Sequence, residues 1–509
     1  MEQPAIACKG VTFRYLEKSR PILEDVSFSL PAGSISVLMG SSGCGKSTLA
    51  SVLCGLLPEN GGFLSSGEIT LFGKPLKSFS PRERTKEISM MFQNPDLQFC
   101  MKTLRKELYF CMENICIPRE EMERRAENAA KAIGIERLLD RPLHTLSGGE
   151  KQRAVLACIY LLDAKCILLD EPFANLDPDS VQELMTLLHR LCREQGKTIV
   201  AIDHMADHWI GTADRFLLLG PGARVLCQTE SLEQFEQVKT LFREQGVAYP
   251  GIWQETELPH GNANRTGSSI VLHGLTMPEV PQKPKKRRKP AACVAQDQSL
   301  LFEGNAVFPA GQITAILGPS GSGKTSLLMT LLGQRDYLGD IEIQNGDIHK
   351  DMRDMHPAER FSAVGMAFQN PENQFVTQNV TAEIMDGLQR RYADETPDTL
   401  RTRAIALLDS CGLKKYQEFS PYMLSQGQQR RLAVLAVLAG GQKVLLLDEP
   451  TYGQDYRSAR ALMDQVREQV QAVGLTVLMT THDRGLAETY ADVRYRLEGH
   501  RLTREVDTL

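Results

Sequence analysis

The chain has 509 residues and a formal net charge of −5, and 42% of its residues are hydrophobic and 24% charged. At roughly 150 residues per domain, this length allows about two to four domains, and the small negative charge excludes nucleic-acid binding by bulk positive charge. No apolar run reaches the roughly 18 residues of a membrane-spanning helix, and the N-terminus lacks the basic start and apolar core of a secretory signal.

Two glycine-rich segments fit the pattern G-x-x-x-x-G-K-[ST]: Gly40–Ser47 and Gly318–Thr325. Each follows an apolar run that predicts a buried strand, Ile35–Met39 or Ile313–Leu317, and each precedes a helical pattern. Glycine lets backbone N–H groups approach a polyphosphate closely, and the helix N-terminus adds positive charge. The sequence therefore predicts two nucleotide-phosphate sites.

The residue types in these two loops have separate tasks. The lysine reaches the β- and γ-phosphates, and the hydroxyl that follows it meets Mg²⁺. We expect the nucleotide phosphates to be held by Gly40, Ser41, Ser42, Gly43, Cys44, Gly45, Lys46, Ser47 and Thr48 in the first loop, and by Gly318, Pro319, Ser320, Gly321, Ser322, Gly323, Lys324, Thr325 and Ser326 in the second.

The two loops belong to a long internal repeat. Lys324 follows Lys46 by 278 positions (324 − 46), and Asp448 follows Asp170 by the same distance. A period of this length indicates two copies of a whole domain. We expect a first domain at residues 1–230, a short helix and linker at 231–268, and a second domain at 269–509.

The second copy contains additional Pro-rich, basic residues at about 278–292. Such a segment can bind anionic lipid or nucleic acid, and it can equally be a solvated loop. The twelve cysteines contain no C-x-x-C pair, and Cys54, Cys158 and Cys166 fall in segments expected to be buried. This scatter favours reduced thiols in a cytosolic chain over disulfides or a metal site.

Each copy contains an apolar run that ends in Asp-Glu, at residues 166–171 and 444–449. The run is typical of a central parallel strand, whose carboxyl end is where open α/β sheets bind ligands. The aspartate is a candidate Mg²⁺ ligand, and the glutamate can polarise an attacking water. The candidates are Asp170 and Asp448 for the metal, and Glu171 and Glu449 for catalysis.

Each copy also contains Leu-Ser-x-Gly before a helical pattern. Ser147 precedes Glu150 by three residues, and Ser425 precedes Gln428 by three, so both segments fit a capping box. A capped helix start beside glycine can bind an anion. The predicted helices cover Arg153–Leu162 and Arg430–Leu438, and the candidate anion contacts before them are Ser147, Gly148, Gly149, Ser425 and Gly427.

The order of these motifs, with a glutamine after the loop and a histidine after the acidic strand, resembles ATP-binding cassette ATPases over nearly the whole chain. The resemblance implies an α/β fold with two P-loop ATP-binding cassette domains in tandem, each with an antiparallel β subdomain and a helical subdomain. It also implies that each ATP lies between the phosphate loop of one cassette and the Leu-Ser-x-Gly segment of the other.

The resemblance assigns further residues. It implies that His204 and His482 act with the catalytic glutamates, that Gln93 and Gln369 contact ATP and Mg²⁺, and that Tyr15 stacks on adenine. Two departures from the family pattern are Gln426, which replaces a glycine, and Glu279, which falls where Tyr15 would align. We therefore expect two hydrolytic sites of unequal strength.

The glutamines lie in near copies of Phe-Gln-Asn-Pro-x-x-Gln-Phe, at Phe92–Phe99 and Phe368–Phe375. This motif resembles the energy-coupling factor importers and their cobalt- and vitamin-transport relatives. The resemblance implies an ATP-hydrolysing subunit at the cytoplasmic face of the cell membrane that drives uptake of a vitamin, a vitamin precursor or a metal ion. Its implied partners are a transmembrane coupling protein and a small substrate-capture membrane protein, with no nucleic acid.

Two alternatives remain open. The chain could serve another ABC transporter class, although the doubled motif disfavours this. It could also be a soluble tandem ATPase that acts on ribosomes, which the absence of membrane spans and the basic run around Lys283–Lys289 favour. The family members that act on ribosomes resemble one another in a long charged linker or an Fe–S cysteine cluster, and this chain has neither.

Overall fold

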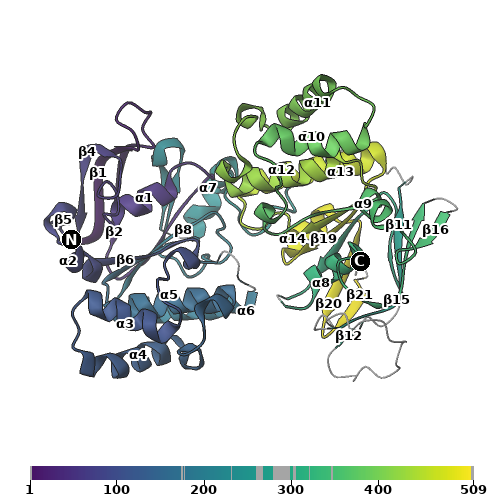
Figure 1. Ribbon diagram of the computed structural model, residues 1–509. Coiled ribbons are helices and arrows are strands. Elements are labelled where there is room, and N and C mark those ends of the chain that lie inside the picture. Colours follow the sequence, from purple (N-terminus) through teal and green to yellow (C-terminus); the bar gives the residue numbers. More distant parts are fainter. Residues whose placement is uncertain are drawn as a thin grey trace. The chain divides into compact units, whose positions relative to one another are not determined.

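The computed structural model describes residues 3–173, 176, 178–230, 232–258, 267–278, 299–301, 305–319, 321–345 and 348–505. It divides into two compact units, Met1–Pro250 with Asp455–Arg457, and Gly251–Gln454 with Ser458–Leu509 (Figure 1). Ser320, Glu279 and nearly all of the predicted basic insertion lie outside the described residues. The predicted domain boundaries at 230 and 269 stay a prediction.

The core of the first unit is a six-stranded sheet with the order β10-β9-β3-β8-β7-β6. Strand β10 pairs antiparallel with β9, and the other neighbours are parallel. Strands β3, β7 and β8 are buried throughout, as the apolar runs of β3 and β7 predict. The strands are β3 (Ile35–Gly40), β6 (Ile88–Met91), β7 (Cys166–Asp170), β8 (Thr198–Asp203), β9 (Arg215–Leu219) and β10 (Val225–Thr229).

A second, antiparallel sheet of this unit has the order β2-β1-β4-β5. Its strands are β1 (Pro4–Arg14), β2 (Leu23–Pro31), β4 (Phe63–Leu71) and β5 (Lys74–Pro75). Its apolar face shares one hydrophobic cluster with helix α1 (Lys46–Leu53), in which Phe13, Leu23 and Leu49 are fully buried. This cluster fixes the helix that leaves the phosphate loop against both sheets.

The helices of the first unit include a separate group formed by α3, α4 and α5, which lie side by side (Figure 1). Helix α5 begins at Gly148, five residues before the predicted start, because the capping box at Ser147 opens the helix directly. The helices are α2 (Pro81–Glu87), α3 (Leu104–Asn114), α4 (Arg119–Ile133), α5 (Gly148–Leu162), α6 (Pro178–Arg193) and α7 (Leu232–Glu244).

The second unit repeats this architecture. Its mixed sheet has the order β17-β18-β19-β14-β20-β21, and its antiparallel sheet has β12-β11-β15-β16 with β13 paired to β11. The strands are β11 (Ser269–Pro278), β12 (Ser299–Leu301), β13 (Asn305–Phe308), β14 (Ile313–Leu317), β15 (Leu338–Asn345), β16 (Ile348–Asp351), β17 (Val364–Ala367), β18 (Val444–Asp448), β19 (Thr476–Thr481), β20 (Val493–Glu498) and β21 (Arg501–Arg504).

Helices α10, α11 and α12 of the second unit form the group that matches α3, α4 and α5 (Figure 1). The two units therefore confirm the predicted fold class: α/β domains in tandem, each with an antiparallel sheet and a helical subdomain. The helices are α8 (Lys324–Leu331), α9 (Pro357–Ala363), α10 (Val380–Arg391), α11 (Pro397–Ser410), α12 (Gln426–Ala439), α13 (Tyr456–Val473) and α14 (Arg484–Tyr490).

Two further observations concern the sequence expectations. Within the described residues, the helices are too short or too polar to cross a membrane. The cysteines in the same part of the chain are free thiols, with Cys54 and Cys166 buried and Cys158 half-buried.

Candidate active site

The phosphate loops connect a central strand to the helix after it. In both copies the residue before the helix is a glycine in the left-handed region, Gly45 with φ 110° and Gly323 with φ 101°, which a residue with a Cβ rarely adopts. Lys46 Nζ donates to the carbonyls of Gly40 and Ser41 at 2.8 and 2.9 Å. The lysine is thus buried against its own loop, ready for phosphate oxygens to replace these carbonyls.

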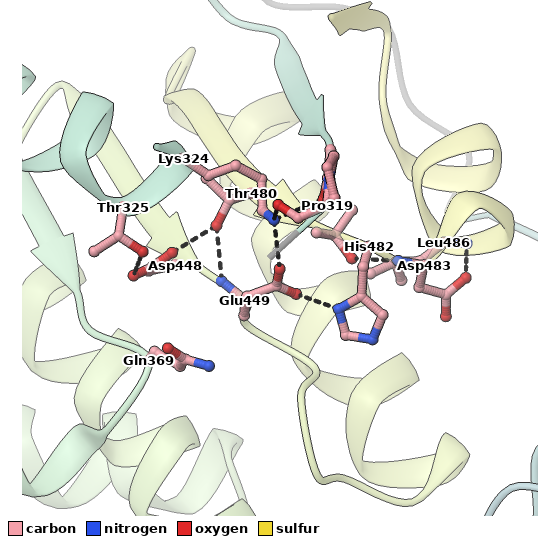
Figure 2. A network of polar contacts seen from close by, with 12 residues as sticks. Pro319, Lys324, Thr325, Gln369, Asp448, Glu449, Thr480, His482, Asp483 and Leu486 are labelled. Atoms are coloured by element: carbon pink, nitrogen blue, oxygen red, sulfur yellow. Dashed lines mark hydrogen bonds and ion pairs between the residues drawn. The ribbon is translucent and has the colours of Figure 1, made fainter. Parts of the chain in front are cut away.

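The second loop has the same arrangement. Lys324 Nζ donates to the carbonyls of Gly318 and Pro319 at 2.7 and 3.1 Å (Figure 2). It also lies 3.7 Å from Glu449 Oε1. The predicted phosphate-binding residues of each loop are therefore brought together, apart from Ser320, which lies outside the described residues.

The catalytic candidates follow strands β7 and β18 directly. Glu171 and Glu449 both have φ 48°, which is uncommon for a residue other than glycine. The backbone N–H of Glu171 donates to Ile202 O at 2.9 Å, and that of Glu449 to Thr480 O at 3.2 Å. An unfavourable backbone conformation kept at the same place in both copies points to a functional constraint.

Each glutamate faces the predicted histidine. His482 Nδ1 lies 3.0 Å from Glu449 Oε2 (Figure 2). In the first copy, His204 Nδ1 lies 3.5 Å from Glu171 Oε1. The structure thus places each histidine beside its glutamate, more closely in the second copy, and their catalytic roles stay a prediction.

The charges of this pair support each other. Burial opposes the charged form of Glu449, but His482 and Lys324 hold its pKa below the ordinary value. Burial likewise opposes charge on His482, but Glu449 raises the pKa of the imidazole above its ordinary value. Glu171 and His204 shift in the same directions for the same reasons. Each site therefore favours a carboxylate beside an imidazolium.

The predicted metal ligands differ between the copies. Asp448 accepts hydrogen bonds from Thr325 Oγ1 at 2.8 Å and from Thr480 Oγ1 at 2.7 Å (Figure 2). The first copy has Ile202 at the position of Thr480, and among the described residues the buried Asp170 Oδ1 has no hydrogen-bond donor. Burial, with help from the neighbouring Glu171, raises the pKa of Asp170 to about 6.

These oxygens fit Mg²⁺. In the second copy, a threonine hydroxyl and an aspartate oxygen are already within hydrogen-bond distance, so one cation can contact both. In the first copy, a buried carboxylate oxygen without a donor is available to a cation. Both sets consist of hard oxygen ligands, the kind that Mg²⁺ prefers.

The predicted glutamines behave differently in the two copies. Gln93 Nε2 donates to Glu171 Oε2 at 2.5 Å, so the side chain lies against the catalytic candidate. In Figure 2, no hydrogen bond joins Gln369 to the residues drawn around Glu449. The expected role of both glutamines as metal ligands stays a prediction.

The other residues of the Phe-Gln-Asn-Pro-x-x-Gln-Phe motif hold its loop. Gln98 Oε1 accepts from Phe92 N at 2.8 Å, and its Nε2 donates to Met90 O at 2.9 Å. Asn94 Oδ1 accepts from Asp96 N at 3.0 Å, which caps a short turn. In the first cassette, these hydrogen bonds fix the conformation of the loop from which Gln93 contacts Glu171.

Tyr15 lies beside the first phosphate loop. Its hydroxyl is 3.1 Å from Thr48 Oγ1, its ring meets Phe13 edge-on, and 48% of the residue is exposed. An exposed ring at this position is available to a base. In the second copy, Arg335 contacts the hydroxyl of Ser326, the counterpart of Thr48. Adenine stacking on Tyr15 stays a prediction.

The Leu-Ser-x-Gly segments form the predicted capping boxes. Ser147 N donates to Glu150 Oε2 at 2.9 Å, and Ser425 N donates to Gln428 Oε1 at 3.0 Å. Gly148 and Gly149 form the first turn of α5, and Gln426 and Gly427 that of α12. Their contacts with ATP stay a prediction.

Two supporting residues were not predicted from the sequence. Asp203 Oδ1 accepts from the backbone N–H of His204 at 2.7 Å and of Met205 at 3.0 Å, which orients the histidine turn. Thr480 Oγ1 donates a hydrogen bond to Asp448 Oδ1, and the same oxygen accepts one from Glu449 N at 3.1 Å. The offset of 278 positions would have identified Thr480 as a difference, because it aligns with Ile202.

Comparison with known proteins identifies relatives along the whole chain. The family model described as ABC transporter matches residues 23–174 and 301–452. The chain is 35% identical over 501 residues to "Putative HMP/thiamine import ATP-binding protein YkoD" of Bacillus subtilis, covering 96% of this chain and 88% of that one. It is 32% identical over 520 residues to "Putative ABC transporter ATP-binding protein" of Methanosarcina acetivorans, covering 96% of this chain and 83% of that one.

Among solved structures, the chain is similar to the archaeal ribosome recycling factor aABCE1 in its complex with the stalk protein aP1. The TM-score is 0.62 at 19% identity, and the match covers 97% of this chain and 89% of that one. At this identity the likeness concerns the fold alone.

Proposed function

We propose that this chain, which belongs to the ABC transporter family, is the ATP-hydrolysing subunit of a membrane importer. It is an ATPase with two ATP-binding cassettes in tandem, and ATP-binding subunits of this family act with membrane-embedded permease components. The observation that carries the hydrolytic part of the proposal is the doubled Glu–His pair, with a buried phosphate-loop lysine in each cassette. Import is supported by the similarity to a relative named for HMP/thiamine import.

The proposed hydrolysis divides the work among the residues of each cassette. Lys46 and Lys324 bind the phosphates, while Glu171 and Glu449 orient and polarise the attacking water. His204 and His482 hold these carboxylates in place. When bound, Mg²⁺ would offset phosphate charge, and its ligands would be Ser47, Gln93, Asp170, Thr325, Gln369 and Asp448.

Coupling to a membrane partner would use the helical subdomain. A cleft of about 410 Å³ lies beside the motif loop of the first cassette and is lined by Phe92, Gln98 and Phe99, by Glu107 of α3 and by Val155 and Ile159 of α5. The apolar lining suits a helix of a transmembrane coupling protein. Because Gln93 of the same loop contacts Glu171, a helix in this cleft would respond to the state of the nucleotide site.

The transport cycle is proposed as a two-state switch. ATP favours a closed pair, with each phosphate loop facing the Leu-Ser-x-Gly segment of the other cassette, through Ser147, Gly148 and Gly149 on one side and Ser425 and Gly427 on the other. Hydrolysis and phosphate release remove that bridge and reopen the pair. The helical subdomains transmit this movement to the partner.

The importer is assigned to the energy-coupling factor type, with a small substrate-capture membrane protein as third component. The doubled Phe-Gln-Asn-Pro motif supports this assignment. The cargo class is a vitamin, a vitamin precursor or a metal ion. YkoD is named for HMP/thiamine import, which makes HMP and thiamine the first cargo to test.

The deciding experiment is an affinity pull-down of the full chain from detergent-solubilised membranes of its source cell, read by mass spectrometry. Recovery of one multi-span coupling protein with one small multi-span protein is the expected result. Recovery of a larger permease alone would assign another transporter class. Recovery of ribosomal proteins without membrane proteins would overturn the importer and favour a ribosome-associated ATPase.

A transport measurement tests the cargo. Cells that lack the chain should lose uptake of radiolabelled thiamine or HMP, and the wild-type chain should restore it. The double variant E171Q/E449Q is the matched control and should not restore uptake. Uptake that is normal without the chain would exclude this cargo.

A further inference from the structure

Arg430 is a buried arginine in the first turns of α12 whose donors reach two parts of the second site. Its Nη1 donates to the carbonyl of Glu449 at 2.8 Å, and its Nη2 donates to the carbonyl of Gln369 at 3.1 Å. The guanidinium therefore ties the backbone of the catalytic candidate to the backbone of the motif loop.

Tyr452 extends this contact to the histidine. The guanidinium carbon of Arg430 lies 5.3 Å from the centroid of the Tyr452 ring, within cation–π distance. The same ring meets the His482 imidazole edge-on, with 6.0 Å between centroids. Glu449 is thus enclosed by a ring of contacts: its carbonyl binds Arg430, its carboxylate binds His482, and Tyr452 lies between the two.

The first cassette lacks both members of this pair. The positions that match Arg430 and Tyr452 at the offset of 278 are Gln152 and Ala174, so there is neither a guanidinium nor an aromatic ring. The two residues that differ between the cassettes contact each other, because the Arg430 guanidinium lies over the Tyr452 ring. The first cassette therefore has neither residue of this pair at the matching positions.

Burying a guanidinium costs desolvation free energy, because its charge is removed from water. Burial lowers the pKa of Arg430 to about 10, which reflects the cost of holding the charge away from water. Its Nε has no hydrogen-bond partner among the described residues. Packing alone would be served as well by a smaller neutral residue, so the two carbonyl contacts are the specific gain.

We propose that Arg430 and Tyr452 are positioning residues that clamp Glu449 and His482 in the geometry for hydrolysis at the second site. The clamp rests on the site roles proposed above. It fixes the Glu449 carbonyl, and hence the direction of a side chain on a left-handed backbone, while Tyr452 limits the movement of the imidazole. The first site works without it, so the clamp makes the two sites unequal.

The test separates the two sites within one full-length chain. Photoreactive 8-azido-ATP is trapped with orthovanadate and Mg²⁺, cross-linked, and assigned to each cassette from its labelled peptides by mass spectrometry. Binding of the same nucleotide without trapping is measured in parallel. R430Q, which places the first cassette's residue in the second, should lower trapping in the second cassette about tenfold and change its nucleotide affinity less than twofold.

Further variants make the result specific. Y452A should reproduce the loss, and R430Q/Y452A should be no worse than either single variant because the two residues act as a unit. R430K keeps the charge but lacks the fork of donors, so it should remain below half of wild-type trapping. R401Q removes an exposed arginine paired with Glu418 on the surface and should leave trapping unchanged.

Three outcomes would overturn the clamp. They are trapping within twofold of wild type in both R430Q and Y452A, an equal loss in both cassettes, and a loss that nucleotide affinity accounts for. If R430Q does not fold, Y452A and R430K provide the same decision. If the wild-type chain traps nucleotide in neither cassette, the hydrolytic roles themselves fail, and the clamp fails with them.

Discussion

The indole Nε1 of Trp253 donates a 2.8 Å hydrogen bond to Oδ2 of Asp483, the residue that directly follows His482. In the first cassette, Trp209 Nε1 donates to Oδ2 of Asp203, directly before His204, also at 2.8 Å. The chain contains two tryptophans, so each one contacts an acidic neighbour of the histidine in its own cassette.

This relationship makes each tryptophan a reporter of its own site. In W209F, where Trp253 is the sole tryptophan, addition of Mg·ATP should change the emission, because phosphate binding shifts the His482 turn. K324A should abolish the change and K46A should not. W253F should show the opposite dependence on the two lysines. A response that is insensitive to both lysines would contradict the assignment.

The charge pairing predicts a titration. Burial lowers the pKa of His482, but Glu449 raises it above the ordinary value, so this imidazole should have a lower pKa in E449Q than in the wild-type chain. Histidine ring signals in NMR, assigned with H482Q, measure both values. Equal pKa values in the two proteins would mean that the contact carries no charge interaction.

The sign of the linked stability follows from the same shifts. The contribution of His482 is fully present below its ordinary pKa and is lost as the pH rises through its raised pKa. The contribution of Glu449 is present above its ordinary pKa and is lost as the pH falls through its lowered pKa. The pair should therefore stabilise the second cassette most at pH values above the ordinary pKa of Glu449 and below the ordinary pKa of His482.

Replacing the catalytic glutamates should separate turnover from binding. E171Q and E449Q should each lower kcat by about 100-fold at their own site, since a positioned base contributes at least that much, with ATP affinity kept within about threefold. The double variant should not hydrolyse ATP. The matched control is E194Q, which changes an exposed glutamate beyond the end of α6 and should behave as wild type. Hydrolysis that persists in E171Q/E449Q would refute the roles of both residues.

Removing Tyr15 should affect one cassette. Y15A should weaken ATP binding to the first site about tenfold, as expected for the loss of a stacked base, and Y15F should bind normally. Calorimetric titration in a K324A background isolates this site. In a K46A background, Y15A should have no effect, because the remaining functional loop lies in the second cassette and Tyr15 contacts Thr48 of the first. An equal effect in both backgrounds would place Tyr15 outside the adenine contact.

The features that could be predicted are those built from neighbouring residues. The phosphate loops, the strands before them and the capping boxes at Ser147 and Ser425 depend on backbone conformation and hydrogen bonds within a few residues. The internal repeat could also be predicted, because the constant offset of 278 positions between matching motifs is read from the sequence without knowledge of tertiary contacts. The fold class came from the resemblance of these motifs, in their order, to ATP-binding cassette ATPases.

The contacts around the catalytic glutamate depend on distant residues. His482 is 33 positions from Glu449, Arg430 is 19, and Trp253 is 230 positions from Asp483. Their meeting is decided by the register of β18 against β19, which pairs Asp448 with Thr480, and by the packing of α12 beside the end of β18.

The sequence by itself therefore determined which chemistry the chain carries: two phosphate loops and two acidic strand ends, each recognisable from local spacing, and two histidines assigned through the family resemblance. Only the tertiary structure decided what the differing residues contact: Thr480 donates to Asp448, and Arg430 donates to the carbonyl of Glu449. The physical reason is that the parallel pairing of strands and the burial of a helix bring together side chains whose separation along the chain has no fixed period.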